Sequence, residues 1–260
     1  MSVVYLPVAE ERLRGKSWLR SPDYSFASAQ AVAPIIAAEL GDVARVMPLA
    51  FLESGGRFEA VALLSLTPGR NLFVDPDGRW LGTYVPAVLR GYPFRLASSE
   101  KQGEFVLCIA EDAVADTAGS RDGQPFFDAG GALSPELTRI LAYLTEVQSS
   151  RVAMDLAVQS IAAAGLLRPW DIKVRSQGKE MTVAGLKRID EEALNALDAE
   201  ALFELRKSFA LPVVYAQMLA MGHTTVFEGL SRLQGQQQPF PDTAAPPAPD
   251  GARPGLAKAH

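Results

Sequence analysis

The stretch RNLFVDPDGRWLGTYVPAVLRGYPFRL, residues 70–96, gathers aromatic, proline, glycine and arginine side chains more densely than any other part of the chain. Within it, apolar runs at 71–74 and 80–85 flank an Asp-Pro-Asp-Gly turn at 75–78. Proline presets φ at the second turn position, and glycine accepts the positive φ that closes a short hairpin. The pattern predicts a hairpin, followed at 85–96 by an aromatic segment onto which the rest of the chain packs.

The composition limits the classes of function. With 260 residues, 48% of them hydrophobic, the chain can bury a large core. A net charge of −5 without a cluster of basic residues argues against binding a nucleic-acid backbone. The single cysteine, Cys108, excludes an intramolecular disulfide, and its apolar neighbours predict a buried, inert thiol. With only His223 and His260, a site of several imidazoles is excluded, and no metal or other cofactor is expected.

The N-terminus and the apolar runs indicate where the protein resides. The first 16 residues carry several charges and no apolar run, so they do not resemble a signal peptide. No stretch reaches the ~18–20 apolar residues that span a bilayer. A cytoplasmic protein without a membrane span is therefore expected, while export by a route that reads no N-terminal signal stays open.

The first half of the sequence reads mainly as strands joined by turns. An edge strand is predicted at 3–6, followed by a short helix from Pro34 to Gly41. Apolar runs at 43–53 and 58–66 predict two strands that pair across a Ser-Gly-Gly turn. The run at 105–110 is apolar on both faces, which is typical of a central strand.

The second half changes to helical spacing. Ser134, followed by proline and glutamate, is a strong helix start, and one apolar face continues for about 30 residues until Gly165. Alternation in 170–186 predicts a second hairpin. Later helices are predicted after caps at Asp190 and Asp198, from Pro212 to Gly222, and after Thr224 or Thr225.

These elements predict an α+β fold. We expect a strand-rich lobe at about 1–118, packed against a helical lobe at about 134–233 with a small hairpin inserted at 170–186. No flexible linker separates the lobes, so residues 1–235 are predicted to form one cooperative unit. Residues 236–260 are rich in glutamine, proline and alanine and are predicted to be a disordered tail.

Several motifs spread over residues 25–233 make the chain resemble the bacterial SapC family. They are NLFVDPDGRWLGTYVP, RGYPFRL, LSPEL, GLLRPWDIKV, GLKRIDEEALNALDAEAL and LPVVYAQMLAM. The family takes its name from a gene of a bacterial surface-layer locus. The resemblance therefore implies a surface-layer, envelope or export context, and it transfers no catalytic residue.

Arginines bracket the aromatic residues of the 70–96 stretch, with Arg95 among them. Together they could form a concavity for a carboxylate-bearing or aromatic ligand, held by bidentate pairing and ring stacking. Alternatively, the rings belong to the core and the arginines stack over them from exposed strand ends. The candidate ligand-binding residues are Arg70, Trp80, Tyr84, Arg90, Tyr92 and Phe94.

Other candidate sites have weaker patterns. The Asp-x-Asp-Gly motif at 75–78 resembles the start of a calcium loop, but the twelfth position, which needs a bidentate glutamate, is Pro86. His223 follows a helix break without a second histidine and is expected to be a surface residue. Four loop carboxylates could do acid–base work or hold a cation, although no spacing selects a pair: Asp112, Asp116, Asp122 and Asp128.

The sequence contains neither a Gly-x-Ser-x-Gly elbow nor a glycine-rich phosphate loop. The leading hypothesis is a non-catalytic binding or accessory protein for a peptide, a protein, or an acidic or aromatic small molecule. One alternative is an enzyme whose site combines dispersed arginine, tyrosine and carboxylate residues. A second is a surface-layer structural subunit. An apolar edge strand or the helix at 213–221 could also make a homodimer contact.

Overall fold

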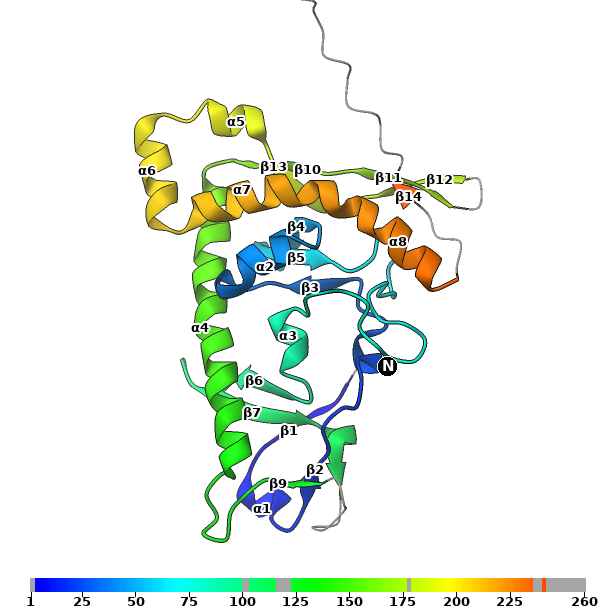
Figure 1. The fold of residues 1–260 in the computed structure, drawn as a ribbon. Coiled ribbons are helices and arrows are strands. Elements are labelled where there is room, and N and C mark those ends of the chain that lie inside the picture. Colours follow the sequence, from blue (N-terminus) through cyan, green and yellow to red (C-terminus); the bar gives the residue numbers. More distant parts are fainter. Residues whose placement is uncertain (1–2, 100–102, 116–122, 177–178, 236–239, 242–260) are drawn as a thin grey trace, which may run out of the picture.

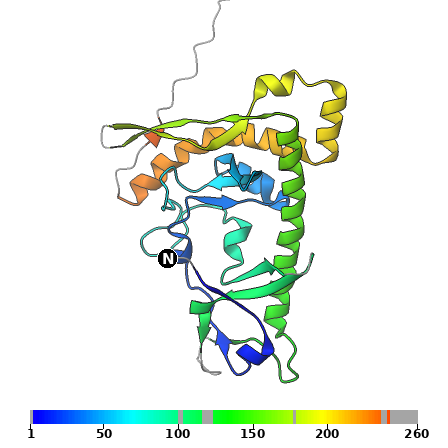
Figure 2. The ribbon, with the colours of Figure 1, turned by 180° about the vertical axis from the view of Figure 1, so that it is seen from behind.

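The computed structural model describes residues 3–99, 103–115, 123–176, 179–235 and 240–241. It confirms the α+β class, with strands prominent in the N-terminal half and helices toward the C-terminus. One long helix, α4 (Pro135–Ala163), runs along the body of the molecule, and the sheets lie beside it (Figure 1; Figure 2).

The larger sheet has the strand order β10-β13-β4-β5-β3, and all neighbouring pairs are antiparallel. Its strands are β3 (Val32–Pro34), β4 (Leu49–Ser54), β5 (Arg57–Leu63), β10 (Leu167–Pro169) and β13 (Leu186–Ile189). The predicted pairing of the runs at 43–53 and 58–66 is confirmed as β4 and β5, although β4 begins only at Leu49. Two strands of this sheet come from the C-terminal half, because β13 pairs with β4.

A second sheet has the order β1-β7-β6 and lies nearer the N-terminal end of α4 (Figure 1). It consists of β1 (Tyr5–Pro7), β6 (Phe94–Ser98) and β7 (Phe105–Ala110). The edge strand and the central strand predicted at 3–6 and 105–110 are therefore confirmed. A small neighbouring sheet consists of β2 (Ser17–Trp18), β8 (Val114–Ala115) and β9 (Gln124–Pro125).

The second hairpin is also confirmed. Strands β11 (Ile172–Ser176) and β12 (Lys179–Val183) pair antiparallel, and β14 (Phe240–Pro241) adds to the free edge of β11. The remainder of the predicted tail, 236–239 and 242–260, lies outside the described residues.

The helix predicted from Pro34 to Gly41 is wrong. Pro34 ends β3, an edge strand in which a residue without an N–H is tolerated. A 3-10 turn, η2 (Ala37–Glu39), follows, and the helix α2 (Leu40–Ala44) contains Gly41 instead of ending there. Val43, predicted as strand, is buried within α2.

The hairpin predicted in the 70–96 stretch is short and has one isolated bridge, between Val74 and Trp80. The turn at 75–78 forms, with Gly78 at φ +80°. The backbone N–H of Tyr24 donates to the Gly78 carbonyl at 2.8 Å, so the turn is attached to a segment far away in the sequence. Two backbone hydrogen bonds cross between the arms beside this bridge, from the Asp75 N–H to the Arg79 carbonyl at 3.0 Å and from the Leu81 N–H to the Phe73 carbonyl at 2.7 Å, so a short hairpin forms and the bond from Tyr24 attaches it to the rest of the fold.

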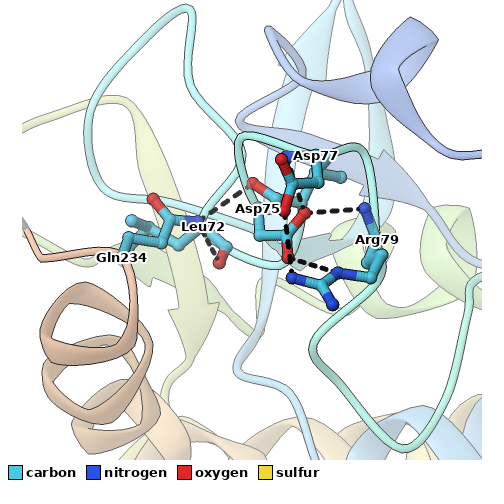
Figure 3. A network of polar contacts seen from close by, with 6 residues as sticks. Leu72, Asp75, Asp77, Arg79 and Gln234 are labelled. Atoms are coloured by element: carbon cyan, nitrogen blue, oxygen red, sulfur yellow. Dashed lines mark hydrogen bonds and ion pairs between the residues drawn. The ribbon is translucent and has the colours of Figure 1, made fainter.

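Two polar side chains hold this loop in shape (Figure 3). The Asp75 carboxylate accepts from the backbone N–H groups of Asp77 and Arg79 at 3.0 and 2.8 Å, and from Arg79 Nε at 2.9 Å. Gln234 directly follows the last helix of the described chain, and its Nε2 donates to the Leu72 carbonyl at 2.8 Å. The loop is therefore bonded both internally and to the end of the chain's helical part.

The start and the end of α4 agree with the sequence prediction. Ser134 Oγ accepts from the Leu137 N–H at 3.3 Å, and Gly165 follows the helix at φ +69°. The predicted apolar face is partly wrong, because Val152 and Leu156 are 58% and 60% exposed. The residues that face the core near this end are Met154, Ala157, Val158 and Ile161.

The remaining helices lie beyond the larger sheet or connect strands. Asp190 and Asp198 cap α5 (Glu191–Asn195) and α6 (Ala199–Lys207) as predicted. The helix predicted at 212–222 is α7 (Ala210–Ala220), and η4 (Met221–Thr225) leads directly into α8 (Val226–Leu233). In this described segment no side chain caps α8, so the predicted threonine cap is wrong. The shorter helices are α1 (Glu10–Leu13), η1 (Ser25–Ala27), α3 (Ala87–Arg90) and η3 (Glu111–Ala113).

Two hydrophobic cores share α4. The larger core contains the five-stranded sheet, α7 and the C-terminal part of α4. The smaller core contains the β1-β7-β6 sheet and the N-terminal part of α4, including Leu137 and Leu144. Each core combines residues from both halves of the chain, so the cores do not coincide with the lobes expected at 1–118 and 134–233. That residues 1–235 unfold as one unit stays a prediction.

Candidate functional site

A cavity of about 370 Å³ lies where the two cores meet. Three segments form its wall: 18–26, which runs from β2 into η1, the end of α3 with the start of β6 at 89–94, and the second and third turns of α4 at 139–143. Pockets of this size accommodate small molecules. The lining side chains that carry charge or aromatic rings are Trp18, Arg20, Asp23, Tyr24, Phe26, Arg90, Tyr92, Phe94, Arg139 and Tyr143.

Ring packing fixes the aromatic part of the wall. Phe26 and Tyr92 stack almost in parallel with ring centroids 3.8 Å apart, which joins two segments that are distant in the sequence. Trp18 and Phe94, both buried, meet edge to face at 4.9 Å. Such pairs stabilise a structure beyond the area they bury, by about 0.5–1.5 kcal/mol. These ring contacts within the protein therefore hold the aromatic part of the wall in place.

Three arginines line the cavity, and their partners differ. Arg20 Nη2 and Arg139 Nη1 both donate to the Glu136 carboxylate, at 2.9 and 2.7 Å. Arg90 Nη2 donates to the Tyr84 hydroxyl at 3.0 Å, with the guanidinium 5.4 Å from the centre of that ring. Within the described part of the chain, no carboxylate lies within ion-pair distance of Arg90. Arg90 therefore offers a cation to the cavity that no acidic side chain neutralises directly.

The tyrosine hydroxyls of the wall are hydrogen-bond donors at neutral pH. Burial, together with the charge of Asp112, raises the pKa of Tyr92 to about 12, and its hydroxyl donates to Asp112 at 3.3 Å. Burial also raises the pKa of Tyr143, whose hydroxyl donates to the Ala87 carbonyl at 3.0 Å. Neither group can act as a base near pH 7, because both stay protonated.

A buried carboxylate stands behind Arg90. Glu39, only 2% exposed, accepts from the Tyr84 hydroxyl at 2.9 Å, the Ala87 N–H at 2.7 Å and the Ile36 N–H at 3.1 Å. Burial raises the pKa of Glu39, and these three donors together with Arg90 oppose that rise. Glu39 accepts a hydrogen bond from Tyr84, and Tyr84 accepts one from Arg90. This relay of Glu39, Tyr84 and Arg90 orients the Arg90 guanidinium.

The six predicted ligand-binding residues divide into two groups. Arg90, Tyr92 and Phe94 line the cavity. The other three lie elsewhere: Trp80 stacks on Phe73 at 5.3 Å, Tyr84 stands between Glu39 and Arg90, and Arg70 donates to Gln234 Oε1 at 2.8 Å. The additional arginine Arg95 lies over the Tyr5 ring, 3.8 Å from its centroid.

The sequence reasoning missed part of the wall. Arg139 and Tyr143 are four positions apart on α4, a spacing that places two side chains on one helix face and could have indicated a polar patch. Arg20 and Tyr24 lie in an irregular segment and Phe26 in the short 3-10 helix η1, so no periodic pattern in the sequence points to them.

The other candidate sites have structural roles or stay open. The Asp75 carboxylate is engaged by the turn and Arg79, and no cluster of three or more potential metal ligands occurs among the described residues. Asp128 bonds backbone N–H groups of its own loop, whereas Asp116 and Asp122 lie outside the described residues. Cys108 is buried as predicted, and burial raises the pKa of its thiol. His223 is half-buried in η4.

The fold and the site define an α+β protein with an arginine- and aromatic-lined cavity between two cores. The chain belongs to the SapC family, whose model matches residues 9–226. This confirms the resemblance seen in the motifs and includes the 18–26 segment of the cavity wall. No curated protein and no solved structure matches the chain. Within the described residues, no helix has the length and apolar character needed to cross a membrane.

Proposed function

We propose that this protein is a non-catalytic binding protein and that its ligand is a small anion with an aromatic or other flat apolar body. The observation that carries the proposal is the cavity itself, because it combines aromatic walls with three arginines. Guanidinium groups suit carboxylate and phosphate groups, which they bind in bidentate fashion. Aromatic faces suit a flat ring.

The charges around the cavity favour an anion over a cation. The lining residues include three arginines and one carboxylate, Asp23, while Glu136 pairs with Arg20 and Arg139 without lining the cavity itself. A cationic ligand would be repelled by the guanidinium of Arg90, which is linked to Glu39 through the Tyr84 hydroxyl and makes no direct ion pair within the described residues, and the ligand would also lose its own hydration.

One observation favours an enzyme as the second candidate: Glu39 is a buried carboxylate with a raised pKa close to a cavity arginine. However, Glu39 already accepts three hydrogen bonds, and Tyr84 lies between it and Arg90. A general base needs a free lone pair within reach of the substrate. The arrangement therefore supports a positioning role for Glu39 more than a catalytic one.

Isothermal titration calorimetry with four matched probes tests the proposal. Benzoate and phenyl phosphate carry the predicted charge, benzyl alcohol is neutral and benzylammonium is positive. We expect the two anions to bind and the cation not to bind. The Arg90→Ala variant should weaken anion binding by about ten- to one-hundred-fold, the range expected for a hydrogen bond to a charged group.

Arg206→Ala is the matched control, because Arg206 is exposed on α6 and does not line the cavity. It should bind the anions as the wild type does. Equal affinity for the cation and the anions, or unchanged anion binding in Arg90→Ala, would remove the cavity from consideration. Turnover of a bound compound that Glu39→Gln abolishes would establish the enzyme instead. A surface-layer subunit predicts concentration-dependent ordered assembly, which sedimentation of the purified protein detects.

A further inference from the structure

The contacts of Glu136 define the place at which the ligand's anionic group is held. Glu136 lies in the first turn of α4, and its two carboxylate oxygens bond different arginines, Oε1 to Arg20 and Oε2 to Arg139. Both arginines line the cavity and come from different segments of its wall. One carboxylate thus joins the two guanidinium groups across the wall, in the manner of a bound carboxylate or phosphate.

These contacts are also easy to break. The side chains of Arg20 and Arg139 are 72% and 76% exposed, and that of Glu136 is 31% exposed. Exposed ion pairs contribute little because water screens them and the side chains lose freedom. A ligand that supplies its own carboxylate or phosphate can therefore replace Glu136 between the two arginines at small cost.

We propose that Glu136, which does not itself line the cavity, occupies the anion position between the lining residues Arg20 and Arg139 in the free protein, and that the carboxylate or phosphate of the ligand displaces it from these two arginines. This rests on the proposed function, since it names where the anionic group of that ligand is held. Arg90 contacts the ligand from the 89–94 segment of the wall. Glu136 competes with the ligand for Arg20 and Arg139, which lowers the ligand's affinity and keeps uncharged compounds from binding these two arginines.

The test measures the affinity for phenyl phosphate and for benzoate in the wild type and in three variants. Glu136→Gln removes the competing charge and keeps the side-chain shape. Two exposed ion pairs oppose the ligand in the wild type, so Glu136→Gln should bind both anions about two- to thirty-fold more tightly. Glu136→Asp keeps the negative charge near the start of α4 but shortens the reach, and it should give a smaller gain.

Asp23→Asn separates displacement from a general change of charge. Asp23 lines the same cavity, and its Oδ1 accepts from the Ser25 N–H at 2.8 Å, a bond that asparagine preserves. This variant removes one negative charge without releasing an arginine, so its gain should be clearly smaller than that of Glu136→Gln. An equal gain would overturn the displacement.

The outcomes separate the two proposals. Tighter binding in Glu136→Gln than in Asp23→Asn supports both. Wild-type binding with unchanged or weaker binding in Glu136→Gln and Glu136→Asp overturns the role of Glu136 and leaves the proposed function intact. No anion binding in the wild type or in any variant, with circular dichroism showing that all are folded, overturns the proposed function and this inference with it.

Discussion

Replacing Glu39 by alanine should destabilise the protein, because within the described part of the chain its carboxylate is the only acceptor of two buried backbone donors. These are the N–H groups of Ile36 and Ala87, at 3.1 and 2.7 Å. A third donor, the Tyr84 hydroxyl, is only half-buried, so it can donate to water when Glu39 is removed. The cost of the substitution is therefore set mainly by the two N–H groups.

The magnitude follows from the number of donors left without a partner. A buried donor that loses its acceptor costs about 1–3 kcal/mol. Two such N–H groups, less the gain from removing a buried charge, give a loss of about 2–4 kcal/mol in the free energy of unfolding. In Glu39→Gln one amide oxygen still accepts, so a single N–H is left without a partner and the loss should be about half as large.

The pH dependence of the stability gives a second, independent test of the role of Glu39. Burial raises the pKa of Glu39 in the folded protein above its ordinary value of 4.5. The stability contributed by this group is therefore fully present below pH 4.5 and is lost as the pH rises through the raised folded pKa. Asp75, whose pKa is lowered by contacts with Arg79, shifts stability in the opposite direction. Its effect is the same in the wild type and in Glu39→Gln, so it cancels in their difference.

Urea denaturation followed by tryptophan fluorescence measures these values at pH 7 and at pH 5. The stability of the wild type relative to Glu39→Gln should be greater at pH 5 than at pH 7. A Glu39→Ala variant within 1 kcal/mol of the wild type would refute the hydrogen-bond account. A wild-type advantage that shrinks on acidification would refute the direction of the pKa shift.

Three further substitutions test other parts of the fold. Gly78→Ala should destabilise the protein by at least about 1 kcal/mol in urea unfolding, because Gly78 has φ +80° and an added Cβ would lie 2.5 Å from Asp23 Cγ. Gln217→Leu should cost about 2–4 kcal/mol in urea unfolding, because its buried amide donates to the Leu49 carbonyl at 3.1 Å and accepts a backbone N–H of β13; a loss below about 1 kcal/mol would contradict this. Ser134→Ala should cost about 0.5–2 kcal/mol in urea unfolding, because the Leu137 N–H loses the Ser134 Oγ that caps α4.

The parts of the fold that local chemistry determines could be predicted from the sequence. Helix α4 follows from its serine cap, its first-turn proline and the glycine after its end, all of which act within a few residues. The β4–β5 pair follows from two apolar runs around a tight turn. The pairing of β13 with β4 could not be predicted, because it joins Leu186 to Leu52 and depends on tertiary packing.

Tertiary contacts also overrule local signals. Pro34 is a good first-turn helix residue, yet the chain uses it to end an edge strand paired with β5. The cavity shows the same limit. Arg90, Tyr92 and Phe94 were predictable as a group because they are close together in one unusual stretch. Tyr24 and Phe26 enter the wall through contacts with segments more than 50 residues apart in the sequence, the Tyr24 N–H bond to Gly78 and the stacking of Phe26 on Tyr92.

The position of the cavity couples binding to stability. Tyr24 and Leu89 of its wall pack with the larger core, while Trp18, Phe94 and Tyr143 pack with the smaller one. A ligand that contacts both sides binds only while the two cores are folded against each other. It therefore stabilises the folded protein by about 2.7 kcal/mol at a concentration one hundred times its Kd. This is close to the loss expected for Glu39→Ala. A saturating anion should therefore restore much of the stability of Glu39→Ala if the relay mainly holds the cores together. If instead Glu39 mainly orients Arg90, the same variant binds the anion too weakly to be rescued, and the two roles of the relay separate in one titration.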